Sequence, residues 1–214
     1  MKSVTSIAFA FLLLTFSLNQ AQSYRNSTYF SGHLGARSST VNSRGQSSGL
    51  NASFGAGFGF PIYKNISFYS KVTYYLNDDF TTYDNVQQLS SDFQLYNTTE
   101  RINGSFSQLI MNTGLQYNIR LSEEFNLGFN GGFTYSLINQ EAKLSNGTII
   151  SSVTNEGAYG YFGGGYIEKR FKDENFAMFA EAQYNYIDGS AIYFRDRFSG
   201  TNVTIGARYY LSGY

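Results

Sequence analysis

The 214-residue sequence predicts an all-β protein, an eight-stranded antiparallel up-and-down β-barrel. Apolar and polar residues alternate with a period of two in eight successive runs of about 11 residues, which indicates strands with one apolar and one polar face. The connections alternate in length as well. Long ones follow the first, third, fifth and seventh runs, and short turns follow the second, fourth and sixth. This asymmetry is typical of a barrel whose two ends face different surroundings.

The clearest hairpin spans residues 107–138. In its second half Phe129 and Phe133 share one face, and Asn126 and Asn130 share the other. The first half alternates in the same way, except that the apolar Ile110 falls on the polar face. The strands that we expect are residues 29–39, 49–60, 66–76, 107–121, 125–138, 156–171, 176–187 and 200–211.

Two of the long connections differ in character. Residues 77–104 are polar and acidic, and we expect them to form the longest loop. Residues 139–155 contain Asn146 and Gly147, a turn signal which suggests that the flanking strands continue as a ribbon before they reverse.

The sixth run can be read in two registers. One register puts Tyr159 and Tyr161 on the apolar face, the other puts Phe162 and Tyr166 there, and the glycines 163–165 would permit a bulge between the two. We prefer the first register because it turns the charged residues Glu168 and Arg170 to the polar face.

Residues 1–23 have the features of an export signal, which would leave 24–214 as a single barrel domain. Lys2 gives a positive start, residues 7–16 are apolar but too few to span a bilayer, and cleavage is expected after Ser23 or Ala21. A short buried N-terminal helix is the alternative. With the signal removed, the chain would be soluble outside the inner membrane or inserted in an outer membrane.

Composition narrows the class of protein further. Charged residues make up 14% of the chain, against about 25% in soluble domains, while aromatic residues reach 18%. The formal net charge is zero, so there is no basic surface to attract nucleic acid. The chain has no cysteine, and no residue pattern indicates a cofactor or a metal site.

The apolar face is expected to point outward, into lipid. An eight-stranded barrel has an interior just wide enough for filling side chains, so the many Phe and Tyr residues of the apolar face do not fit inside it. On the seven strands with a clear alternation, that face carries no charged residue. A charge there would cost about 2 to 4 kcal/mol at the bilayer midplane. The residues expected to face lipid include Phe54, Phe58, Leu109, Met111, Leu115, Phe129, Phe133, Met178, Val203 and Ile205.

The mature chain resembles the small eight-stranded outer-membrane β-barrel family, which includes the OmpA transmembrane domain, OmpX and OmpW. Its final run, residues 203–211, is similar to the C-terminal strand that the barrel assembly machinery recognises in that family, although Ser212 and Gly213 precede the terminal Tyr214. The resemblance implies an outer-membrane location with short periplasmic turns and longer outward loops. It implies the lipid bilayer and the assembly machinery as partners, and says little about biochemical role.

Charged residues of the polar face would lie inside the barrel, where buried charges must be paired. They are His33, Arg37, Lys71, Arg120, Glu168, Arg170, Glu181 and Arg208. Counting from the shared short-turn end puts Glu181 and Arg208 at a similar height, with Lys71 and Glu168 nearby. We therefore expect a salt-bridged plug of the lumen, the alternative being charges that are solvated one by one.

The functions compatible with this pattern are mostly not catalytic. His33 is the only histidine, and no Ser/His or Asp/His arrangement can be identified around it. A structural or interaction role is expected, in membrane integrity, adhesion or binding of a surface ligand through the loops. The alternatives are a narrow, porin-like channel for small or hydrophobic solutes and an accessory barrel of a secretion apparatus.

Overall fold

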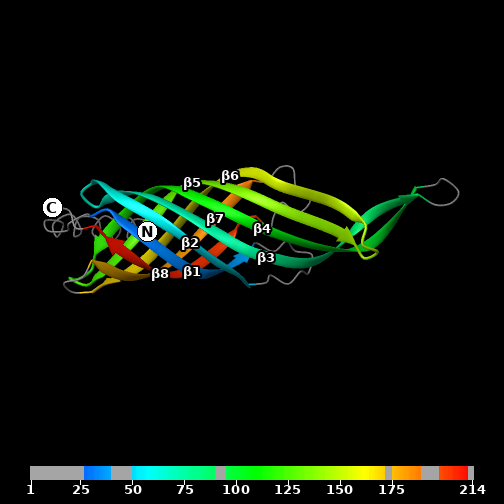
Figure 1. The fold of residues 1–214 in the computed structure, drawn as a ribbon. Coiled ribbons are helices and arrows are strands. Elements are labelled where there is room, and N and C mark those ends of the chain that lie inside the picture. Colours follow the sequence, from blue (N-terminus) through cyan, green and yellow to red (C-terminus); the bar gives the residue numbers. More distant parts are fainter. Residues whose placement is uncertain (1–26, 40–49, 90–94, 172–174, 189–197, 212–214) are drawn as a thin grey trace, which may run out of the picture.

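The computed structural model describes residues 27–39, 50–89, 95–171, 175–188 and 198–211, and the expected export signal lies outside these ranges. The chain forms one closed barrel in which each strand is antiparallel to both neighbours and β1 pairs with β8 (Figure 1). The predicted fold class is confirmed. The strands are β1 Tyr29–Ser39, β2 Leu50–Tyr63, β3 Ile66–Leu89, β4 Leu95–Arg120, β5 Phe125–Leu144, β6 Ile149–Arg170, β7 Phe176–Asp188 and β8 Gly200–Tyr210.

Four strands are much longer than the sequence predicts. Residues 78–89 and 95–104, expected to belong to a loop, continue the β3–β4 ladder from Asp78 opposite Phe106 to Leu89 opposite Leu95. The prediction of a continued ribbon around Asn146 and Gly147 is confirmed, since β5 extends to Leu144 and β6 starts at Ile149. Gly147 has a φ of +86°, which glycine adopts without strain in the turn.

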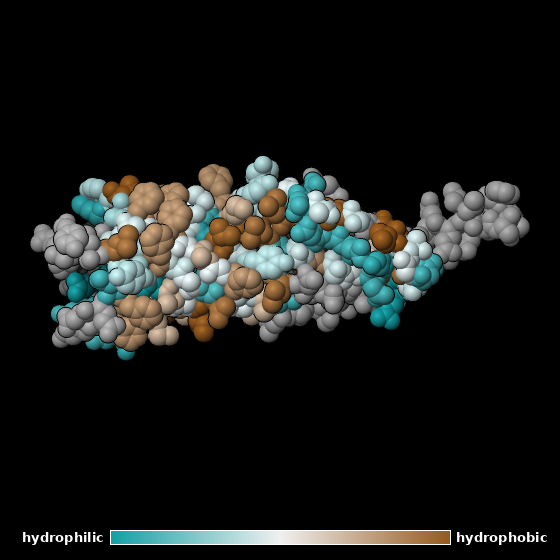
Figure 2. Space-filling view, viewed as in Figure 1, coloured by the Kyte–Doolittle hydropathy of each residue, from teal (hydrophilic) through white to brown (hydrophobic). Residues whose placement is uncertain are grey.

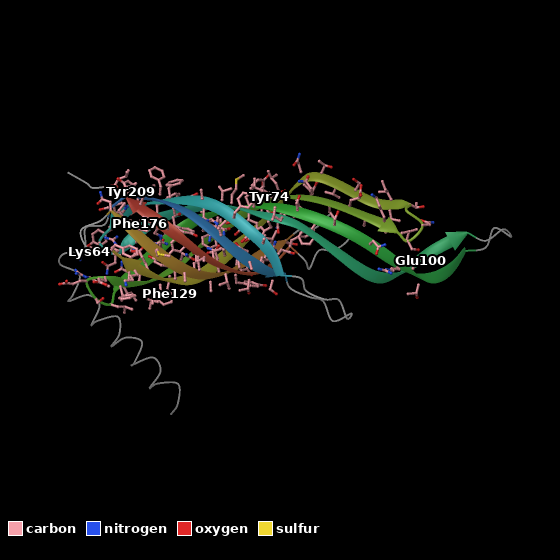
Figure 3. All side chains as sticks on the ribbon, turned by 60° about the horizontal axis from the view of Figure 1, so that its bottom comes forward. Lys64, Tyr74, Glu100, Phe129, Phe176 and Tyr209 are labelled. Atoms are coloured by element: carbon pink, nitrogen blue, oxygen red, sulfur yellow. The ribbon has the colours of Figure 1, made fainter. Side chains whose placement is uncertain are left out.

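The extra length projects from one end of the barrel. We call this part the projecting sheet: β3 from Asp78, β4 up to Phe106, β5 from Asn139 and β6 up to Glu156. Figure 1 shows these strands reaching well beyond the other four, and Figure 3 places Glu100 far out on the sheet. We call the opposite end, where β1 begins and β8 ends side by side, the short-turn end.

The outer surface of the barrel is apolar and bordered by aromatic residues. Phe133 is 80% exposed, and the ten residues predicted to face lipid all lie on the outside, with Leu109 and Met111 half-buried between neighbours. The aromatic residues on this surface form two layers, one at each border of the apolar band. The layer nearer the projecting sheet, the outer layer, is Tyr74, Tyr135, Tyr159, Tyr161, Tyr184 and Tyr186. The inner layer, at the short-turn end, is Phe60, Phe68, Phe125, Phe171, Phe176 and Tyr209. Hydrophilic residues gather on the projecting sheet (Figure 2). A bilayer requires such an apolar band between two aromatic girdles.

The preferred register of the sixth run is the one in the structure. Tyr159 and Tyr161 are exposed, whereas Phe162, Tyr166 and Glu168 are buried. The bulge that the glycines 163–165 would permit is not formed, because pairing with β5 and β7 runs through these glycines without a shift. The irregularities of the β5–β6 pair lie further out, next to Ile138 and Ala142, in the projecting sheet. Among the described residues, no helix has the length and apolarity of a transmembrane span.

A charge on the outer face tests the orientation of the barrel. Phe129 is 51% exposed in the apolar band, so Phe129→Lys should lower the free energy of unfolding in lipid by about 2 to 4 kcal/mol. Phe129→Leu, which keeps the position apolar, is the matched control. Refolding into vesicles, followed by heat-dependent migration on gels, measures the folded fraction. Equal folding of both variants would contradict the orientation.

The alternation alone suggests Asn130 as a neighbouring position that tolerates a charge. The structure changes this expectation, because the Asn130 amide donates a 2.5 Å hydrogen bond to the buried Glu181 carboxylate. A charge at Asn130 would therefore disturb the lumen and is not a neutral control.

Candidate functional site in the barrel lumen

Inward-facing side chains fill the lumen in three successive groups. Near the short-turn end lies the inner network, which is Tyr29, Gln116, Asn126, Tyr166, Glu168, Arg208 and Tyr210. In the middle lies the central network, which is Tyr69, Lys71, Asn130, Glu181, Gln183 and Thr204. Towards the projecting sheet lies the outer cluster, which is Tyr75, Phe106, Ile110, Ile138, Ala158, Ile187 and Phe198.

The inner network is organised around the ion pair of Glu168 and Arg208. Arg208 Nη1 lies 2.7 Å from Glu168 Oε2, and the Tyr210 hydroxyl donates to the same oxygen at 2.6 Å. Asn126 Nδ2 donates to the other carboxylate oxygen at 2.9 Å. The arginine guanidinium lies 4.1 Å from the centroid of the Tyr166 ring, a favourable cation–π geometry. The buried charge therefore has hydrogen-bond partners on both carboxylate oxygens.

Two glycines create room for the tyrosines of the inner network. Gly128 on β5 lies opposite Tyr166 and under its ring, where a Cβ atom would collide with ring carbons. Gly59 on β2 lies opposite Tyr29 and under its ring in the same way. Glycine on the inner face thus permits large aromatic side chains to lie flat against the barrel wall.

The central network joins strands on opposite walls of the barrel. Lys71 Nζ on β3 lies 2.5 Å from Glu181 Oε2 on β7, two strands that are not neighbours. The Tyr69 hydroxyl donates to Glu181 Oε1 at 3.1 Å, and Asn130 donates to the same oxygen. Both side chains of the ion pair are almost fully buried, at 4% and 2% exposure. A crosslink of this kind fills the lumen where it lies.

The pairing of the lumen charges differs from what counting along the strands suggests. Glu181 lies opposite Thr204 on β8 and Arg208 lies opposite Ala177 on β7, so the two are four residues apart in the ladder. Each instead has an ion-pair partner on another strand: Lys71 for Glu181, and Glu168 for Arg208.

Three other residues were predicted to face the lumen, namely Arg170, Arg120 and His33. Arg170 Nε lies 3.2 Å from Glu168 Oε1, and its guanidinium stacks 3.8 Å from the Tyr210 ring centroid. Arg120, the last residue of β4, is half-buried and donates to the Ser122 carbonyl in the following turn. His33 is buried, with Nε2 3.1 Å from the Thr73 hydroxyl.

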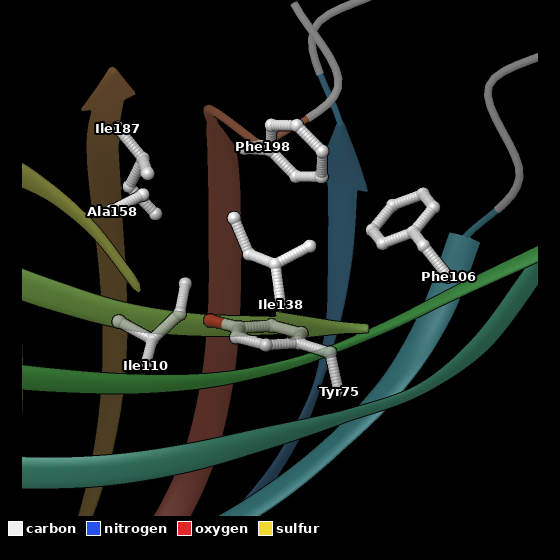
Figure 4. Close-up of a cluster of buried hydrophobic side chains, with 7 residues drawn as sticks. All are labelled: Tyr75, Phe106, Ile110, Ile138, Ala158, Ile187 and Phe198. Atoms are coloured by element: carbon white, nitrogen blue, oxygen red, sulfur yellow. The ribbon is translucent and has the colours of Figure 1, made fainter. Parts of the chain in front are cut away.

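The outer cluster replaces polar lumen residues with apolar ones (Figure 4). Ile110, the exception in the sequence pattern, belongs to it and is fully buried. The remaining members on the strands also have inward parity, so the same signal could have identified Phe106, Ile138 and Ile187. Phe198 is different, because it precedes β8 in a region expected to be a loop, where alternation gives no information.

Arg37 holds Phe198 in the outer cluster. Its guanidinium donates to the Phe198 carbonyl through Nη2 and to Gln108 Oε1 through Nη1, and it lies 4.7 Å from the Tyr75 ring centroid. The Ser199 hydroxyl in turn accepts a 3.0 Å hydrogen bond from the Ile187 amide. Phe198 and Ser199 are thus held inside the mouth of the barrel.

Within the described residues, the lumen carboxylates of the two networks bind cations of the same chain. Within the described ranges, no group of three or more His, Cys, Asp and Glu residues could hold a metal ion. The carboxylates of Glu168 and Glu181 are both occupied by cations and hydrogen-bond donors.

A closed eight-stranded barrel with an apolar outer band and a filled polar lumen has the architecture of the small outer-membrane β-barrels. Similar solved structures are members of that class. The crystal structure of Neisserial surface protein A has 14% sequence identity and a TM-score of 0.51, with 86% of this chain and 97% of that chain covered. The crystal structure of Ail, the attachment invasion locus protein of Yersinia pestis, has 10% identity and a TM-score of 0.53, with 87% and 99% covered. At these identities the likeness shows the fold alone. No protein-family model matches the chain, and no curated protein matches it.

Breaking the central ion pair tests its energetic role. Glu181→Gln leaves the Lys71 ammonium buried without its counter-charge, so the free energy of unfolding should fall by about 3 to 5 kcal/mol. The double variant Lys71→Met/Glu181→Gln removes both charges and should lose less. Urea titration of the refolded barrel measures both values. Lys71→Met alone completes the comparison, and a double variant as destabilised as the sum of Lys71→Met and Glu181→Gln would show that the charges act independently.

Proposed function

We propose that the protein is exported, loses residues 1–23, and folds into the outer membrane as a non-conducting barrel that presents the projecting sheet to a binding partner outside the membrane. The observation that carries the proposal is the contrast between the two parts of the barrel. The part within the apolar band has a filled lumen, whereas in the projecting sheet the described part of β3 pairs with β4 alone, and the coloured surface of the sheet is mostly hydrophilic (Figure 2).

The lumen supports a role without transport. A solute would have to pass the Glu168–Arg208 pair, the Lys71–Glu181 pair and then the outer cluster. Both ion pairs are buried and hydrogen-bonded, and separating such a pair is costly because each charge would be left uncompensated. The outer cluster adds an apolar constriction, which disfavours water and ions.

The projecting sheet supports a role in binding. The pairing of β3 with β2 ends at Tyr75, so from Asp78 to Leu89 the described strands pair with β3 on one side only. The pairing of β6 with the described part of β7, which ends at Asp188, reaches Tyr159. Unpaired backbone edges can accept a further strand from another chain. The similar structures carry names of surface and attachment proteins, and we extend a role of that kind to this chain.

Electrical recording tests the closed lumen. In planar bilayers the wild-type barrel should give no stable conductance steps, because buried ion pairs and the outer cluster occupy the path. The variant Lys71→Ala/Glu181→Ala/Phe198→Ala, combined with Glu168→Ala/Arg208→Ala, removes both ion pairs and the aromatic ring at the mouth, and it should conduct. Steps in the wild-type protein whose size changes with Lys71→Gln or Arg208→Gln would contradict the proposal and favour a channel.

Shortening the sheet tests the binding role. Replacing residues 80–103 by a four-residue Gly-Ser turn removes most of the β3–β4 extension and leaves Phe106 and the outer cluster in place. The barrel should still fold, as heat-dependent migration on gels reports, but cells displaying it should lose adhesion to surfaces that bind the intact protein. The variant Lys71→Met/Glu181→Gln, with an intact sheet, is the control. Unchanged adhesion after shortening would contradict the proposal.

A further inference from the structure

On the outer face of the described strands, the region from one aromatic layer to the other contains a single charged side chain. It is Lys169. It lies on β6, on the same parity as the exposed Tyr159, Tyr161 and Ile167, and is itself exposed. On the strands with a clear alternation the outward positions are free of charge, so this lysine departs from the pattern. An ionisable residue in such a surface indicates a functional position.

The surroundings of Lys169 are aromatic. Its Nζ lies 5.7 Å from the centroid of the Phe125 ring, directly across the β5–β6 pair, and 6.0 Å from the Phe171 ring. Phe171 stacks on Phe176 at 5.7 Å, and Met178 lies opposite Lys169 on β7. The ammonium group is therefore bordered by apolar side chains at the level of the inner layer.

No carboxylate of the described chain neutralises this lysine. Glu168, the preceding residue, points inward and pairs with Arg208. Glu124 is exposed next to Phe125, and its backbone carbonyl accepts a hydrogen bond from the Arg170 amide, but its side chain forms no ion pair with Lys169. The cation thus offers its hydrogen-bond donors to the surroundings of the barrel.

The position of Lys169 at the border of the apolar band indicates which anion it would bind. It is the next-to-last residue of β6, at the short-turn end, where an apolar band meets the headgroup region of a bilayer. The anionic groups present at that depth are lipid phosphates, and an ammonium is well suited to bind them. The Phe125 and Phe171 rings would contact the adjoining acyl and glycerol groups while they hold the ammonium by cation–π attraction.

We propose that Lys169, Phe125 and Phe171 form a binding site for the headgroup phosphate of a phospholipid in the leaflet at the short-turn end. The site rests on the proposed function in one respect, namely that the barrel is inserted in a bilayer. It goes beyond that function by assigning a specific lipid contact to a defined patch of the outer wall.

Native mass spectrometry of the refolded barrel tests the site. The protein is released from detergent micelles that contain either phosphatidylethanolamine or phosphatidylglycerol, and the retained lipid is counted. Lys169→Gln should retain about fivefold less phosphatidylglycerol, since one lysine near an anionic lipid headgroup contributes at this level, and it should also retain less phosphatidylethanolamine. Lys169→Arg should restore retention, and Phe125→Leu, which keeps an apolar side chain but removes the ring, should lower it in part.

Lys143→Gln is the matched control, because Lys143 lies on the projecting sheet and pairs with Glu141, away from the apolar band. Equal retention by wild type, Lys169→Gln and Lys143→Gln would overturn the site. Loss confined to phosphatidylglycerol would overturn it too, because it would indicate attraction to net charge rather than binding of phosphate. Heat-dependent migration on gels verifies that each variant is folded, so a barrel that fails to insert contradicts the proposed function and not this site.

Discussion

The structure depends on one constraint, that no backbone hydrogen-bonding group is left unpaired where the chain meets an apolar surrounding. Closure of the sheet through the β1–β8 pair, from Tyr29 opposite Tyr210 to Ser39 opposite Gly200, removes both edges from the apolar band. Alternation of side chains then follows, because every strand of a closed barrel has one outer and one inner face. The polar inner face is in turn enclosed, so its charges must be neutralised within the lumen.

The requirement for paired backbone groups applies only within the apolar band, and the closed barrel gives way to the projecting sheet where that band ends. Beyond Tyr75 the described part of β3 can keep an open edge, since water satisfies unpaired backbone groups. The inner face changes as well, from the polar networks to the outer cluster around Ile110 and Phe198. The closed wall with its filled lumen and the sheet that projects from it thus belong to two different surroundings.

Sequence reasoning succeeded where lipid imposes a strict pattern and failed where it does not. The eight strands, their order and the register of β6 could be predicted, because a misplaced residue such as Glu168 would face hydrocarbon. The length of β3 and β4 could not, since residues 77–104 are polar on both parities and alternate only weakly. The partner of Glu181 depends on contact across the lumen between non-adjacent strands, and Phe198 enters from outside the strands, so neither left a periodic signal.

The Lys71–Glu181 contact has a consequence for the kinetics of the barrel. The two residues are 110 positions apart and belong to opposite walls, so they meet only when the sheet has already curled into a cylinder. An interaction absent from the rate-limiting state leaves the speed of assembly unchanged and slows disassembly. If the ion pair forms after the rate-limiting step, it lengthens the lifetime of the inserted protein without delaying its insertion.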